Sequence, residues 1–125
     1  DYDRPGNIRE HITRLNKIRR ENPALWDFRN IQFMNAWNDN VIAYAKLTEK
    51  RDNCVVVLVN LDTRNRQDVD FEIPLWEFGL PDHATIEAED LLGGGRFTLR
   101  NKTQRIALDP ANRPVVIWRL IPPTP

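Results

Sequence analysis

The stretch "LNKIRRENPALW" (residues 15–26) marks the point where a helical pattern gives way to strand patterns. From residue 8 to residue 18, apolar residues recur at spacings of four, three and three, which places them on one face of a helix. This stripe consists of Ile8, Ile12, Leu15 and Ile18. Pro5 suits the first turn of such a helix, and Asn22 before Pro23 ends it. Because its stripe is narrow, the helix would be marginal in water and needs a surface to pack against.

After the quoted stretch, apolar and polar residues alternate with a period of two, which is typical of half-buried strands. Turn signals separate about eight such segments at spacings of roughly 8 to 12 residues, as in a sandwich or barrel. The expected strands are residues 31–37, 41–47, 54–61, 68–75, 84–92, 96–101, 104–109 and 115–121. We therefore expect a mainly β fold, an antiparallel β-sandwich of about eight strands preceded by one α-helix.

The burial of individual residues follows from the same patterns. The segment "CVVVLVNL" (54–61) is apolar on both faces, which indicates a central strand and makes Cys54 a buried, inert thiol. The triplet "GGG" (93–95) is typical of a hairpin turn that needs positive φ angles. Strand parity assigns further side chains to the core, namely Ile31, Phe33, Trp37, Val69, Phe71, Ile73 and Trp118.

Length, charge and cysteine content limit the classes of protein. The 125 residues suit one domain, and 18 basic residues balance 18 acidic ones, which gives no support to nucleic-acid or anionic-membrane binding. No apolar run approaches the roughly 20 residues that a membrane helix needs. The single cysteine excludes an internal disulfide and, with the polar first residues, favours the cytoplasm.

Carboxylates on the expected strands raise the question of glycosidase chemistry. They are Asp68, Asp70 and Glu72 on one strand and Glu87 and Glu89 on another. Each set shares one face of an amphipathic strand, which favours a solvated surface over a dry catalytic pocket. His11 and His83 have no metal-binding residue at ligand spacing, so neither a metal site nor a cofactor is expected.

Trp26 and Trp76 are the candidates for a sugar or domain contact. Both are predicted in loops, and each is followed two residues later by a phenylalanine, Phe28 or Phe78. Flat aromatic rings can stack on sugar rings, although most large aromatic side chains are buried by packing. A carbohydrate-binding module that uses these tryptophans therefore stays open as an alternative function.

Residues 1–25, "DYDRPGNIREHITRLNKIRRENPAL", resemble the last barrel helix of the α-amylase superfamily, glycoside hydrolase family 13. In that superfamily the helix leads from a catalytic (β/α)₈ barrel into a C-terminal antiparallel β-sandwich. Later segments fit that domain in order, namely "NDNVIAYAK" (38–46), "VVVLVNLD" (55–62), "DLLGGGRFTL" (90–99) and "IALDPANRPVVIWRL" (106–120). The resemblance is closest to the α-1,4-glucan:maltose-1-phosphate maltosyltransferases, while α-amylases and trehalose synthases share a looser pattern.

This resemblance implies that the chain consists of three parts. Residues 1–25 would be the last barrel helix and a linker, with "NPAL" as the hinge, residues 26–121 a Greek-key sandwich, and residues 122–125 a tail. The parent enzyme would transfer maltosyl units from maltose 1-phosphate to α-1,4-glucans. Its aspartate nucleophile and glutamate acid/base lie on the barrel, so no catalytic, metal-binding or cofactor-binding residue carries over. The fragment alone is therefore expected not to be an enzyme.

The resemblance also implies the partners. They are the catalytic barrel of the same chain, the α-glucan and maltose 1-phosphate bound by the parent, and a second subunit in a homodimer. Neither nucleic acid nor a membrane is expected as a partner. A pure interaction module is a further alternative, in which the apolar helix stripe mediates self-association or repacks on the sandwich.

Overall fold

The computed structural model describes residues 5–27 and 29–123, with the side chains of residues 13–27 and 29–123. Helix α1 (Pro5–Glu21) comes first, and the 3₁₀ turn η1 (Pro23–Trp26) follows it. The strands are β1 (Ile31–Phe33), β2 (Val41–Leu47), β3 (Cys54–Asn60), β4 (Gln67–Glu72), β5 (Thr85–Asp90), β6 (Arg96–Arg100), β7 (Thr103–Leu108) and β8 (Val115–Ile121). A second 3₁₀ turn, η2 (Leu75–Phe78), lies between β4 and β5.

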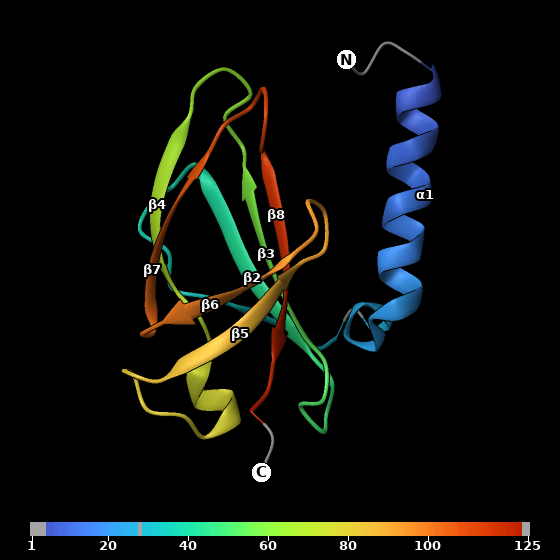
Figure 1. Ribbon diagram of the computed structural model, residues 1–125. Coiled ribbons are helices and arrows are strands. Elements are labelled where there is room, and N and C mark those ends of the chain that lie inside the picture. Colours follow the sequence, from blue (N-terminus) through green and yellow to red (C-terminus); the bar gives the residue numbers. More distant parts are fainter. Residues whose placement is uncertain (1–4, 28, 124–125) are drawn as a thin grey trace.

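The strands pair in antiparallel fashion and form two sheets (Figure 1). The larger sheet has six strands in the order β1-β2-β3-β8-β5-β6, and the smaller one consists of β4 and β7. Within the larger sheet, β8 lies between β3 and β5. The expected class, an antiparallel β-sandwich preceded by one α-helix, is confirmed. In the part of the chain that the structure describes, no helix is long and apolar enough to cross a membrane.

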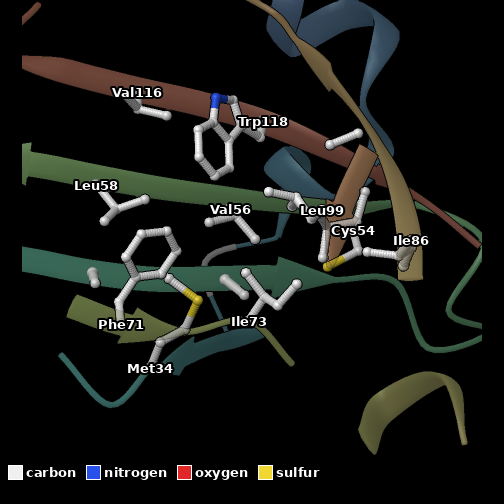
Figure 2. Close-up of a cluster of buried hydrophobic side chains, with 14 of the residues drawn as sticks. Met34, Cys54, Val56, Leu58, Phe71, Ile73, Ile86, Leu99, Val116 and Trp118 are labelled. Atoms are coloured by element: carbon white, nitrogen blue, oxygen red, sulfur yellow. The ribbon is translucent and has the colours of Figure 1, made fainter. Parts of the chain in front are cut away.

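The main core lies between the two sheets, and Figure 2 shows its central side chains. Phe71 on β4 is 0% exposed, and its ring centroid lies 6.1 Å from that of Trp118 on β8. Phe97 on β6 meets the Trp118 indole edge-on, with the centroids 5.0 Å apart. Val69 and Ile73 are also buried, so the expected core positions in residues 69–73 and at Trp118 are confirmed.

A second, smaller apolar cluster lies on the outer face of the six-stranded sheet. It contains Val55 and Val57 of β3, Ile117 of β8 and Ala24 of η1. The opposite face of β3, which includes Cys54, contributes to the main core, so β3 is buried on both faces. The prediction of a central strand with a buried thiol is confirmed.

The expected inward direction of Ile31, Phe33 and Trp37 is wrong, because all three side chains are exposed. Phe33, at 70% exposure, pairs with Tyr44 on the outer face of β2. Met34 enters the core instead, so the true parity differs from the expected one by one residue. Such a shift reverses the face of every side chain in a strand.

The parity argument failed at Trp37 for a further reason. Trp37 lies beyond the end of β1, where the chain crosses towards the smaller sheet. Its backbone N–H donates to the carbonyl of Asp70 at 2.9 Å, and Ala36 forms an isolated bridge with Phe71 of β4. A crossing between sheets interrupts the period of two, so a parity that is counted along one strand does not extend across it.

Candidate functional site

The outer face of the six-stranded sheet carries a continuous group of apolar side chains. The register places Phe33 beside Tyr44, and it places Ile42 beside Val59 and then Val115. The rings of Phe33 and Tyr44 meet edge-on, with their centroids 6.3 Å apart. We call this group the outer patch; its members are Ile31, Phe33, Ile42, Tyr44, Val59 and Val115.

The outer patch is only partly covered by the rest of the chain. Ile31, Phe33 and Ile42 are exposed, whereas Tyr44 is half-buried, and this burial raises the pKa of its hydroxyl. The neighbouring outer cluster around Val57 is packed under η1 and residues 91–92. A contiguous exposed apolar surface next to a covered one is typical of a contact site for another protein or domain.

The other half of the same sheet face, over β5 and β6, is charged. Glu89 on β5 accepts a hydrogen bond from Arg119 on β8, with the oxygen and nitrogen 2.8 Å apart. Glu87 and Arg96 on this half are exposed. The apolar contact surface is therefore confined to the half formed by β1, β2, β3 and β8.

Helix α1 stands on the same side of the larger sheet as the outer patch, opposite β4 and β7 (Figure 1). Ile18 is buried, and Arg14 Nη1 donates to the carbonyl of Leu92 at 3.1 Å. Leu15 is exposed and lines a groove of about 700 Å³ together with Leu92 and Val115. The helix thus leaves apolar surface open between itself and the sheet.

The predicted helix is confirmed, since α1 spans 17 residues and ends before Asn22. Its predicted apolar stripe is described only in part, because the side chains of Ile8 and Ile12 lie outside the described ones. Of the remaining two members, Ile18 is buried and Leu15 is exposed. Repacking of the stripe on the sandwich and self-association through it both stay predictions.

The two candidate tryptophans are both exposed. Trp26 lies in η1, and its indole Nε1 donates to the carbonyl of Arg19 at 2.6 Å, which holds the ring against the end of α1. Trp76 lies in η2, where the sequence predicted a loop. The residues that follow the two tryptophans, Asp27 and Glu77, line one polar cleft of about 440 Å³. A sugar or domain contact at Trp26 and Trp76 stays a prediction, and Phe28 lies outside the described residues.

The other candidate groups lie in ordinary structural surroundings. Asp70 and Glu72 on β4 form ion pairs with Arg105 and Lys102.

Burial raises the pKa of the Cys54 thiol to about 12, so the thiol is protonated at neutral pH. Among the described side chains, those of residues 13–27 and 29–123, no group of three or more from histidine, cysteine, aspartate and glutamate could hold a metal ion. The side chain of His11 lies outside the described ones, and that of His83 is exposed.

Sequence reasoning missed two features of this part of the molecule. The first is the outer patch, although the segment 41–47 carries apolar residues at Ile42 and Tyr44 as well as on its core face, a signal that could have indicated it. The second is a pair of buried amides, Asn22 and Asn53, at the junction of α1 with the sandwich. The sequence carries no evident signal for this pair, since asparagines are also common in turns.

The arrangement of a helix followed by a sandwich recurs in solved α-amylases. An α-amylase from Geobacillus thermoleovorans, complexed with acarbose, matches 99% of this chain and 25% of its own, with a TM-score of 0.65 and 18% identity. An Anoxybacillus α-amylase matches 93% of this chain and 23% of its own, with a TM-score of 0.59 and 23% identity. These likenesses define the class by fold alone, a β-sandwich preceded by a helix, as also found in these α-amylases.

Similarity in sequence defines the family within that class. Residues 33–120 match the family described as "GLGE, C-terminal", and the chain belongs to this family. It is 50% identical over 123 residues to the α-1,4-glucan:maltose-1-phosphate maltosyltransferase of Cereibacter sphaeroides, and 48% identical over 120 residues to that of Pseudomonas aeruginosa. These matches cover 98% and 96% of this chain but 18% of each relative. The expected relationship to maltosyltransferases is confirmed.

Proposed function

We propose that this chain serves as the non-catalytic C-terminal domain of a cytoplasmic maltosyltransferase that extends α-1,4-glucans from maltose 1-phosphate. One observation carries the proposal: the chain matches relatives of this name over 98% of its own length and 18% of theirs. In this proposal, residues 1–25 belong to the last barrel helix and its linker, and residues 26–121 form the sandwich domain. The glucan and maltose 1-phosphate bind to the barrel, and the catalytic acids lie there.

The outer patch and α1 support a role as a scaffold for that barrel. If α1 is a barrel helix, the barrel lies on the side of the sheet that α1 occupies, and this is the side of the outer patch. The patch exposes Ile31, Phe33 and Ile42. These side chains can stabilise the folded protein by hydrophobic burial only when another surface covers them. Complete burial of such a side chain contributes about 1.5–3 kcal/mol. The catalytic barrel of the same chain is therefore the proposed occupant of the patch.

A chimera tests this proposal directly. In the Cereibacter sphaeroides enzyme, the segment that matches this chain is replaced by residues 1–125, and phosphate release from maltose 1-phosphate is measured with maltoheptaose as acceptor. We expect the chimera to transfer maltosyl units and the isolated chain to release no phosphate. Turnover by the isolated chain, or a folded chimera without activity, would contradict the proposal.

A paired variant locates the contact. Phe33→Ser combined with Ile42→Ser removes apolar area from the outer patch, and we expect the chimera to unfold at a lower temperature. Glu87→Ser, on the charged half of the same sheet face, serves as the matched control and should leave the unfolding temperature unchanged. Equal unfolding temperatures for the two variants would show that the barrel does not cover the patch.

A further inference from the structure

Buried amide side chains fill the turn between α1 and the sandwich. Asn22 and Asn53 are 2% and 7% exposed, although polar side chains are rarely buried without hydrogen-bond partners. Asn22 Nδ2 donates to the carbonyl of Ile18, in the last turn of α1, at 2.8 Å. Asn53 Nδ2 donates to Asn22 Oδ1 at 3.1 Å, and Asn53 Oδ1 accepts from the Ala24 N–H at 2.9 Å. One amide pair thus connects the end of the helix to the sandwich.

Further hydrogen bonds hold this amide pair and the turn around Ala24 in place. Asn53 is held in the β2–β3 turn, where its N–H donates to Thr48 Oγ1 at 3.1 Å and its carbonyl accepts from the Thr48 N–H at 3.0 Å. Asn30 Nδ2 donates to the carbonyls of Ala24 at 3.0 Å and Leu47 at 2.7 Å. The turn around Ala24 is therefore bonded to two side-chain amides, of Asn53 and Asn30, and these are in turn held by Thr48 and by the carbonyl of Leu47.

Rotation of α1 about this turn would break several of these bonds at once. A buried polar group that loses its partner is costly, because water cannot replace the partner. In addition, Ala24 is completely buried in the outer cluster beside Val55 and Val57, and Pro23 has a restricted φ angle. These constraints favour a rigid connection over the hinge that the resemblance implied at "NPAL".

We propose that Asn22 and Asn53 form a rigid elbow that holds α1 at one fixed angle to the sandwich. The two asparagines are positioning residues, since they act through the helix and not on a substrate. If the proposed function holds, the elbow fixes α1, as the last barrel helix, and the outer patch as one preformed surface for the rest of the barrel. Preorganisation of this kind strengthens association because less freedom is lost on contact.

A distance measurement in the 125-residue chain tests the elbow without reference to any enzyme activity. Spin labels are attached at Asn16→Cys on α1 and Thr98→Cys on β6, two exposed positions, and the distance distribution is measured by double electron–electron resonance. Cys54 is completely buried and takes no label in the folded chain. We expect a narrow distance distribution in the labelled chain that keeps Asn22 and Asn53. The same labels should give a broad distance distribution after Asn53→Ala.

Hydrogen exchange gives a second readout at the elbow itself. Because the Ala24 N–H loses its acceptor in Asn53→Ala, we expect its exchange to accelerate by about tenfold or more. Asn60→Ala is the matched control, because Asn60 is also a buried amide and donates to the carbonyls of Asn65 and Leu108 inside the sandwich. This control should lower the unfolding temperature and leave both the distance and the Ala24 exchange unchanged.

Asn22→Ala covers the case in which Asn53→Ala does not fold, since Asn22 lies outside the strands of the sandwich. It removes the bond to Ile18 and should broaden the same distance distribution. A broad distance distribution in the chain that keeps Asn22 and Asn53 would overturn the elbow. So would distributions in Asn22→Ala and Asn53→Ala that are as narrow as in that chain. Neither result would affect the proposed function, which the chimera tests by maltosyl transfer.

Discussion

Phe71 and Phe33 have the same side chain and opposite surroundings. Phe71 is enclosed between the two sheets beside Trp118, whereas Phe33 lies on the outer face beside Tyr44. The difference arises from strand register, since each phenylalanine lies in a strand of the sandwich. The contribution of each ring to the stability of the isolated chain should differ accordingly.

We expect Phe71→Ala to lower the free energy of unfolding by about 3–5 kcal/mol, because it removes buried contacts and leaves a cavity. Phe33→Ala, at an exposed position, should change it by less than about 0.5 kcal/mol. Urea denaturation of the isolated chain, at a concentration low enough to keep it monomeric and followed by tryptophan fluorescence, measures both values. Similar losses for the two variants would indicate that Phe33 is covered in solution.

At the scale of elements, the turn between β3 and β4 is organised by one carboxylate. The backbone N–H groups of Arg64 and Asn65 donate to Asp62 Oδ1 at 2.9 Å and 3.0 Å. These bonds, together with those from the side chains of Asn65 and Gln67, hold the pKa of the Asp62 carboxyl below its ordinary value of 3.8. The ionised carboxylate therefore stabilises the turn, and protonation weakens it.

The sign of the pH effect follows from this lowered pKa. A group whose pKa is lower in the folded chain contributes stability above its unfolded pKa and loses this contribution as the pH falls through its folded pKa. We expect Asp62→Asn to destabilise the chain at about pH 7 and to destabilise it less at about pH 2.5, as measured by urea denaturation at both values. Asp39→Asn, at an exposed turn position, is the control. A destabilisation by Asp62→Asn that is the same at both pH values would contradict this account.

Most elements could be predicted from the sequence, because each depends on local signals. The end of α1 at Asn22-Pro23, the strands at 41–47 and 115–121, and the glycine turn all agree with the structure. In that turn Gly94 and Gly95 have φ angles of 85° and 92°, which favour glycine. The first strand begins at Ile31 as predicted but ends at Phe33 instead of residue 37. Its buried face was also predicted wrongly, because its parity depends on pairing with β2. The elbow could not be predicted either, since Asn22 and Asn53 meet only after folding.

At the scale of the whole molecule, the sandwich has two apolar regions on opposite sides of one sheet. The main core is closed by β4 and β7, while the outer cluster is closed only in part, by η1 and residues 91–92. The exposed remainder is the outer patch. In the isolated chain no barrel covers this surface. A second copy of the chain could cover it instead, because exposed apolar patches tend to associate.

We therefore expect the isolated chain to self-associate through the outer patch. Sedimentation velocity should detect a species larger than a monomer that increases with concentration, and Phe33→Ser with Ile42→Ser should reduce it. Trp76→Ser, which removes an exposed aromatic ring from η2, is the control and should leave the association unchanged. A chain that remains monomeric at all concentrations, with or without the patch, would contradict this expectation.

The central position of β8 has a consequence for the timing of folding during synthesis. Strand β3 has β2 and β8 as its neighbours, yet residues 61–114 separate β3 from β8 in sequence. Because contacts over long sequence separations form slowly, the sheet can be completed only after residues 115–121 have left the ribosome. Until then β3, which is apolar on both faces, has an unpaired edge. The nascent chain therefore passes through a period in which its most hydrophobic segment is prone to aggregation.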